Sequence, residues 1–152
     1  LFDKKSSIIS ASSKASKQAE KSRTITEIRR LAADIEAEAM RIELIAPQTQ
    51  MAYSNLAVFL GAVSGSRQQV HQAGVDVNLK ESRSILGDVR KEMVSLKSKQ
   101  GCLSNDDLEK IQISMWEKFQ MLLVTSEKLN REYASLYQRI LVHYQQRVGT
   151  PA

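Results

Sequence analysis

The last third of the chain carries its most regular pattern of apolar and polar positions. Apolar side chains recur there at steps of three and four residues, with one position taken by Ser126 or Thr125. Ser104 can cap the segment, and Gly149 with Pro151 can end it. The spacing predicts a helix over 104–148, about 65 Å long. Its apolar positions are Leu108, Ile111, Met115, Phe119, Leu122, Leu129, Tyr133, Leu136, Ile140, Tyr144 and Val148.

A second helical pattern begins near the start of the chain and predicts a helix over 5–46. The side chains of its apolar stripe are small at first, with alanine and serine between Ile8 and Ile25, and are larger after Ile25. Pro47 ends this predicted helix, because a proline biases the residue before it away from helical backbone angles. The stripe positions are Ile8, Ala11, Ala15, Ala19, Ser22, Ile25, Ile28, Ala32, Ile35, Ala39 and Ile42.

The middle of the chain, residues 49–100, shows two helical stripes separated by a weak region. One stripe runs from Ala52 to Val63 and the other from Val75 to Leu96. Glycines and glutamines lie between them, so we expect a kink or a break near residues 65–76. Three segments of similar length favour an elongated, all-α, up-down-up three-helix bundle. A turn at Gly74 would instead give a four-helix bundle.

Length and composition indicate one helical-bundle domain over residues 1–152. The chain begins at Leu1 rather than at a methionine, so we expect it to be a fragment of a larger protein. The one cysteine, Cys102, excludes an intramolecular disulfide framework, and no signal peptide or membrane-spanning run is visible. These features slightly favour the cytoplasm and leave the compartment open.

Candidate catalytic and metal-binding groups are sparse. His71 and His143 share no motif, and no base is predicted near Cys102. The acidic residues at 34, 36, 38 and 43 could suggest a metal site, but the other helices offer no paired histidines. We therefore expect no catalytic residues, no metal, no cofactor and no enzymatic activity.

Charge is concentrated at the start of the chain. Residues 1–30 hold eight lysines and arginines against three acids, a net charge of +5. Lys14, Lys17 and Lys21 stand one turn apart and form a basic stripe that could meet an anionic membrane or an acidic protein. Nucleic-acid binding is less favoured, because aromatic residues for stacking are missing there. A solvated helix face is the simpler interpretation.

The run from residue 51 to residue 65 is nearly uncharged. It ends in two glycines four residues apart, which permit close helix contact, but it is too short to span a bilayer as a single helix. A helix segment buried on two sides is the simpler interpretation, and a segment that enters a membrane is the alternative. The residues concerned are Met51, Tyr53, Leu56, Phe59, Leu60, Gly61 and Gly65.

Tyrosines form the last candidate surface. Tyr133 and Tyr144 also fit the apolar stripe of the third helix, whereas Tyr137 is offset from it and is the better candidate for a partner contact.

These patterns together favour a non-catalytic helical-bundle module for protein–protein interaction, a scaffold or adaptor segment with coiled-coil-like helices. Its partner would be another protein or a second copy of the chain, because so long a stripe often exceeds what two helices cover. The alternative is a membrane-active helical protein that binds anionic lipid or forms pores through the basic first helix and residues 51–65. Weak nucleic-acid binding is a third hypothesis.

Overall fold

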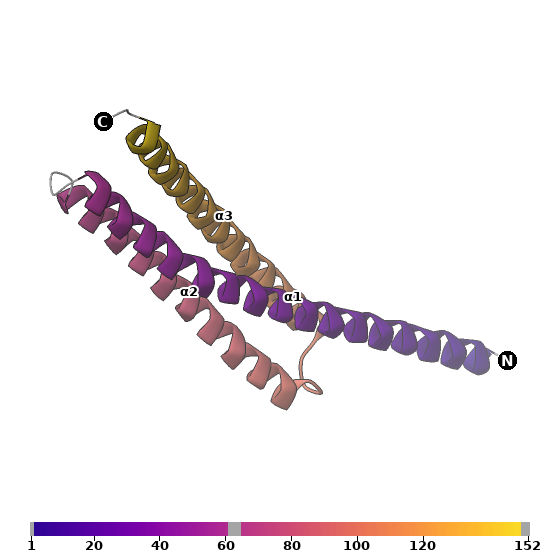
Figure 1. Ribbon diagram of the computed structural model, residues 1–152. Coiled ribbons are helices and arrows are strands. Elements are labelled where there is room, and N and C mark those ends of the chain that lie inside the picture. Colours follow the sequence, from indigo (N-terminus) through magenta and orange to yellow (C-terminus); the bar gives the residue numbers. More distant parts are fainter. Residues whose placement is uncertain (1, 61–64, 150–152) are drawn as a thin grey trace.

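The computed structural model describes the backbone of residues 2–60 and 65–149, and side chains within residues 13–58 and 71–147. The described residues form three helices, α1 (Phe2–Leu60), α2 (Gly65–Lys99) and α3 (Asn105–Gly149), and contain no strand (Figure 1). The predicted all-α three-helix class is confirmed. The predicted third helix over 104–148 also agrees with α3.

Polar contacts give the direction of each helix. Glu36 pairs with Arg90 and Glu43 with Arg83, so residue numbers rise along α1 as they fall along α2. Lys21 of α1 lies beside Ser104 at the start of α3, and Tyr53 near the end of α1 bonds to Glu132 farther along α3, so α3 runs in the same direction as α1. The arrangement is therefore up-down-up, as the sequence predicted.

The predicted end of the first helix at Pro47 is wrong. α1 continues through Pro47 to Leu60. The proline side chain is exposed, so its ring points away from the helices that α1 packs against. Ala46 and Thr49 beside it are fully buried, and the Thr49 hydroxyl donates to the Ile45 carbonyl at 2.8 Å. Packing of this face outweighs the backbone hydrogen bond that proline removes.

The boundaries of the second helix are corrected as well. Residues 49–60 belong to α1, and α2 begins at Gly65. The predicted break near 65–76 is absent from the described residues, since Gly74 lies inside α2 with open space around it. The helices have 59, 35 and 45 residues, so the similar lengths that the sequence suggested do not hold for the first two. The four-helix alternative is wrong.

The start of α3 is capped as expected. The Asp107 backbone N–H donates to the Ser104 hydroxyl at 3.1 Å, and the Ser104 N–H donates to the Asp107 carboxylate at 3.3 Å. This reciprocal pair satisfies donors that the first helical turn leaves free. Hydrogen bonding of the Asp107 carboxylate to the Ser104 side chain, and secondly to the Ser104 backbone N–H, holds the pKa of Asp107 below its usual value.

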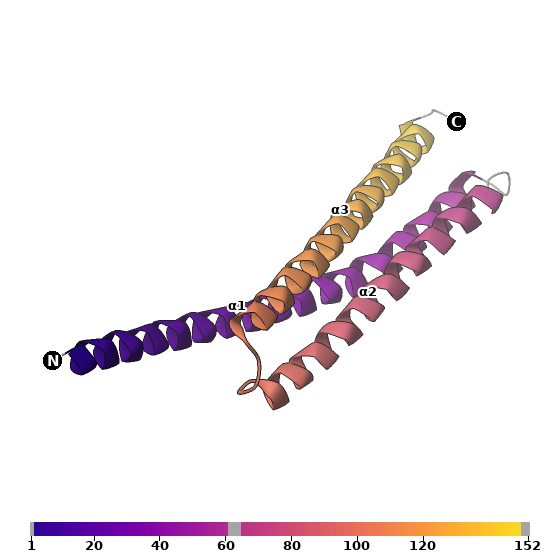
Figure 2. The same ribbon diagram turned by 180° about the vertical axis from the view of Figure 1, so that it is seen from behind.

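The core lies on α1. One face of α1 packs against both neighbours, whereas α2 and α3 make little contact with each other. Figures 1 and 2 show α1 between the other two helices. The buried positions advance by threes and fours along each helix, as in coiled coils. The largest fully buried apolar side chains are Ile28, Ile35 and Ile42 of α1, Val75 and Val89 of α2, and Leu108, Met115, Leu122 and Leu129 of α3.

The N-terminal part of α1 projects beyond the other two helices (Figure 1). The buried face ends at Ile25, and the predicted continuation of the stripe through Ser22, Ala19 and Ala15 is wrong, since all three are exposed. Side chains this small offer little apolar surface to bury, and every side chain from residue 13 to residue 20 is exposed. This projecting part carries the basic stripe.

Candidate interaction surfaces

The structure does not bring the candidate catalytic groups together. Cys102 is exposed in the connection between α2 and α3, which crosses α1 near Arg29. His71 lies toward the other end of the bundle, where its ring stacks on Tyr53 with centroids 5.0 Å apart. His143 is half-buried near Leu56. Among the described residues, no group of histidine, cysteine, aspartate and glutamate side chains could hold a metal ion.

The acidic residues of α1 are engaged in ion pairs. The Glu36 carboxylate lies 2.8 Å from Arg90, and the Glu43 carboxylate lies 2.6 Å from Arg83. The hydrogen bond from Arg83 is the largest cause that holds the pKa of Glu43 below its usual value. These pairs lie along the edge of the α1–α2 contact. The carboxylates that the sequence offered as possible metal ligands thus join α1 to α2.

Glu38 is the one acidic side chain of that group that is buried. One of its carboxylate oxygens accepts a hydrogen bond from Arg41 at 2.6 Å, one turn along the same helix. Its contact is therefore also with an arginine of this chain, and the acidic residues of α1 do not converge on one point.

Lys14, Lys17 and Lys21 lie on the projecting part of α1. Lys14 and Lys17 are exposed and Lys21 is half-buried. Lys17 and Lys21 line a shallow pocket together with Ser104, Asn105 and Asp106 at the start of α3. The basic stripe therefore lies on the surface, and its Lys21 end approaches the acidic first turn of α3.

The segment from residue 51 divides between two faces of the bundle. Tyr53 and Leu56 are buried in the core, and the Tyr53 hydroxyl donates to Glu132 at 3.4 Å. Met51 faces solvent with 66% of its surface exposed. Gly65 begins α2, whereas the side chains of Phe59 and Leu60, and Gly61 itself, lie outside the described residues. Among the described helices, none is long and apolar enough to cross a membrane.

The three tyrosines of α3 separate in the structure. Tyr133 packs against the core, and its ring lies 6.3 Å from that of Tyr137. Tyr137 is half-exposed, in accord with its offset position. Tyr144 is also exposed, although its spacing suggested the core, because the buried spacing runs through Ile140 and the half-buried His143 instead.

One exposed apolar feature, on the outside of α1, is missed by the sequence analysis. Along the outside of α1, eight exposed residues advance by steps of four and three, the spacing of a coiled-coil contact face. Met40, Leu44 and Val58 are 66%, 69% and 82% exposed, far more than side chains of their kind usually are. We call this feature the outer stripe; it consists of Ala33, Ala37, Met40, Leu44, Pro47, Met51, Ser54 and Val58.

Most of the outer stripe is uncovered by α2 and α3; the exception is Ser54, whose hydroxyl accepts a hydrogen bond from the Gln72 side chain of α2 at 3.1 Å. Between the stripe and the core run Glu36, Glu43 and Gln50, which contact α2; Gln50 donates to Asp76 at 2.5 Å. On the other side of the stripe lie Arg41 and Gln48, both exposed. The stripe is therefore a second apolar face on a helix whose first apolar face is already buried against α2 and α3. A second three-and-four spacing offset from the core positions was the sequence signal for it.

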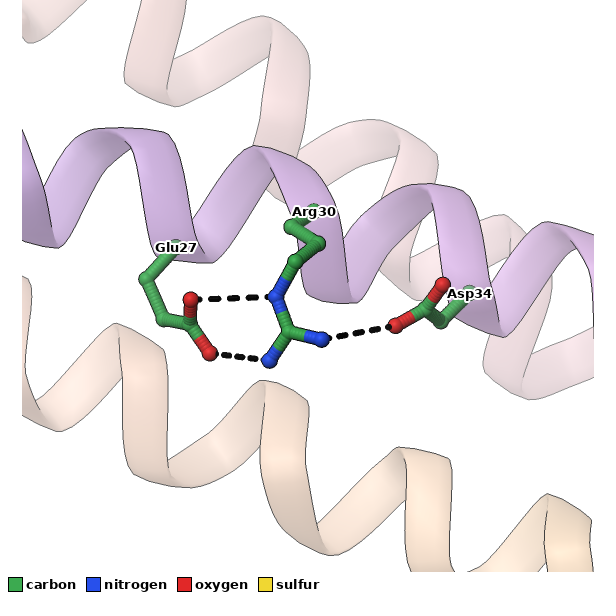
Figure 3. Close-up of polar contacts among 3 residues, drawn as sticks. All are labelled: Glu27, Arg30 and Asp34. Atoms are coloured by element: carbon green, nitrogen blue, oxygen red, sulfur yellow. Dashed lines mark hydrogen bonds and ion pairs between the residues drawn. The ribbon is translucent and has the colours of Figure 1, made fainter.

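Charged residues border the N-terminal end of the outer stripe. Arg30 bonds to Glu27 through two nitrogens, and a third guanidinium nitrogen lies 3.5 Å from Asp34 (Figure 3). The hydrogen bond with Arg30 holds the pKa of Glu27 below its usual value. Arg30 occupies the position that would precede Ala33 in the three-and-four spacing of the outer stripe. Because Arg30 is charged, the apolar part of the stripe ends at Ala33.

No protein family, curated protein or solved structure matches this chain.

Proposed function

We propose that the chain is a non-catalytic protein–protein interaction module, a scaffold or adaptor segment that binds a helix along the outer stripe of α1. The exposed apolar spacing of this stripe is the observation that supports the proposal. Burying it would remove apolar surface from water at about 25 cal/mol per Å², and its spacing matches the contact face that one helix offers to another.

The test compares the outer stripe with the polar face beside it. Leu44→Glu places a charge in the stripe, and Gln48→Glu places the same charge one turn away on an exposed polar position. Proteins that lie next to the chain in cells are identified by proximity labelling, with the solution mass measured in parallel. The proposal predicts associations, with itself or with other proteins, that Leu44→Glu abolishes and Gln48→Glu retains. If both variants keep all associations of the unaltered chain, the proposal is wrong.

A second candidate function rests on the projecting part of α1. Lys14 and Lys17 are exposed there, and a lysine close to an anionic membrane contributes about 1 kcal/mol of binding free energy. We propose as the alternative that this part binds anionic lipid headgroups.

Cosedimentation with vesicles tests the membrane alternative. It predicts binding to phosphatidylserine vesicles and none to neutral ones, with loss of binding in the Lys14→Glu/Lys17→Glu variant. A Lys110→Glu/Lys128→Glu variant makes the same change in charge on exposed positions of α3 and should bind as the unaltered chain does. Equal loss in both variants would show a dependence on net charge alone.

A further inference from the structure

We infer that the chain binds an inositol phosphate, free or as a lipid headgroup, in a pocket beside the connection between α2 and α3. The pocket holds about 520 Å³ between α1 and this connection (Figure 2). The inference is independent of the proposed function, because no residue of the outer stripe lines the pocket. The lining residues that decide its chemistry are Gln18, Lys21, Ser22, Ile25, Arg29 and Gln100.

Two cationic side chains lie on one face of α1 in this pocket. Lys21, Ile25 and Arg29 follow one another at steps of four residues, so they share that face. Ile25, between the two cations, is buried. Lys21 and Arg29 are about 12 Å apart along the helix. Two side chains of this length can therefore contact one anion that lies between them.

Carboxylates do not neutralise these two cations. No aspartate or glutamate lines the pocket, and neither Lys21 nor Arg29 forms an ion pair with a described residue. Arg29 instead donates to the side-chain oxygen of Gln100 at 3.4 Å, and a neutral amide leaves its charge in place. The next residue, Arg30, is by contrast engaged by two carboxylates (Figure 3). The pocket therefore favours an anionic ligand.

The surroundings of the pocket leave its positive charge in place. One acidic side chain, Asp106, lines the adjoining shallow pocket at the start of α3. Lys17 and Lys21 line the same shallow pocket and offset that charge. The end of α2 has a partial negative charge, which Lys97 and Lys99 in its last turn balance.

The charged groups favour phosphate over carboxylate. The guanidinium of Arg29 presents paired N–H donors that match phosphate oxygens, and the ammonium of Lys21 adds a compact positive charge. A phosphate monoester carries nearly two negative charges at neutral pH, whereas a carboxylate carries one. The two cations of the pocket therefore match one phosphate group.

The rest of the lining indicates what the phosphate is attached to. A volume of about 520 Å³ is typical of small-molecule sites and leaves room beside one phosphate. No aromatic side chain lines the pocket, so a nucleobase would find no stacking partner. Gln18, Ser22 and Gln100 offer the amides and the hydroxyl that hydrogen-bond to alcohol groups. A phosphorylated polyol such as an inositol phosphate meets these conditions.

Isothermal titration calorimetry of the full chain with inositol trisphosphate tests the inference. We expect saturable binding that Lys21→Gln and Arg29→Gln each weaken about 10-fold or more, because each removes a charge-assisted hydrogen bond. Arg29→Lys should weaken binding less than Arg29→Gln, since it keeps the charge and loses only the paired donors. Lys14→Gln and Arg23→Gln remove the same charges from exposed positions outside the pocket and should bind as the unaltered chain does. Circular dichroism verifies that each variant is folded.

Vesicles distinguish the two sources of the ligand. Phosphatidylinositol bisphosphate vesicles are compared with phosphatidylserine vesicles of the same surface charge. If the ligand is a lipid headgroup, the chain cosediments preferentially with the first, and Arg29→Gln removes this preference while Arg23→Gln keeps it. If the ligand is a free inositol phosphate, the calorimetric binding is found without any preference between the vesicles.

Three results would overturn the inference. The first is the absence of saturable binding to inositol trisphosphate. The second is equal weakening by the pocket variants and the control variants, which would show general attraction to a basic helix. The third is tighter binding of a phosphoserine peptide than of inositol trisphosphate, which would show that a protein supplies the phosphate. None of these results bears on the outer stripe, so the proposed function is tested separately.

Discussion

Leu122 of α3 shows what a single side chain contributes to this bundle. It is almost completely buried, whereas Val124, two residues along the same helix, is 64% exposed. The sequence pattern placed Leu122 in the core correctly, since three-and-four spacing over many turns leaves little doubt about which face of a helix is buried.

We expect Leu122→Ala to lower the free energy of unfolding by about 2–5 kcal/mol, because the truncation removes apolar contacts and leaves a cavity. Val124→Ala serves as the control and should change it by about 0.5 kcal/mol or less. Urea unfolding of both variants makes the comparison. Similar effects in the two would contradict the burial of Leu122.

Tyr53 couples folding to pH. Burial is the main cause that raises the pKa of its phenol, and the negative charge of Glu132 is the next. The neutral phenol is therefore favoured in the folded state. Its contribution to stability is complete below the usual tyrosine pKa of about 10 and is lost as the pH rises through the higher folded-state pKa.

The predicted result is a loss of stability above about pH 10 that is smaller in Tyr53→Phe, which cannot ionise at this position. Tyr137→Phe is the control, because Tyr137 is half-exposed. Urea unfolding at neutral and alkaline pH measures the loss for each protein. If Tyr53→Phe loses as much stability as Tyr137→Phe, the buried phenol is not the cause.

At the scale of the helix, tertiary packing of α1 outweighs the tendency of proline to end a helix. A proline usually ends a helix, and by that rule Pro47 ended the predicted one. Whether a helix continues past a proline depends on what the following turns bury, and the burial of Thr49, Tyr53 and Leu56 emerges only when α2 and α3 are in place. Local propensity could not supply that information.

Pro47→Ala should therefore stabilise the protein. The substitution restores an N–H that can donate to the Glu43 carbonyl, and proline in a helix interior costs about 3 kcal/mol relative to alanine. Part of the gain is offset by the greater freedom of the unfolded chain, so we expect a net increase of about 1–2 kcal/mol in the free energy of unfolding. Gln48→Ala is the neighbouring control. No gain relative to that control would show that α1 accommodates the proline without cost.

The two ends of α1 should also differ in stability. An isolated helix is marginal in water, and no side chain of α1 between residues 13 and 24 is fully buried. Backbone amides of residues 5–22 should exchange hydrogen fast, and those of residues 115–140 slowly. Equal protection in the two ranges would mean that the projecting part is covered in solution.

The whole molecule is organised around α1. Its core face packs against α2 and α3, its projecting end carries the lysines, and most of its outer stripe is exposed to solvent. The sequence predicted the class of fold, the direction of the helices and the extent of α3. It did not predict the unequal helix lengths, since weak spacing and several glycines made the middle region ambiguous. The outer stripe was missed because two apolar spacings overlap on one helix and the buried one dominated the pattern.

Methionine oxidation is the measurement that tests the outer stripe as a contact face most directly. Met40 and Met51 belong to the stripe and are each 66% exposed, while Met121 of α3 is 50% exposed away from the stripe. Mild peroxide converts accessible methionine to its sulfoxide, and mass spectrometry gives the rate at each position. In the dilute purified protein all three should react readily. When the protein is oxidised inside cells, where its partners are present, Met40 and Met51 should be protected while Met121 stays reactive. If Met40 and Met51 stay as reactive as Met121 in cells, no partner covers the stripe.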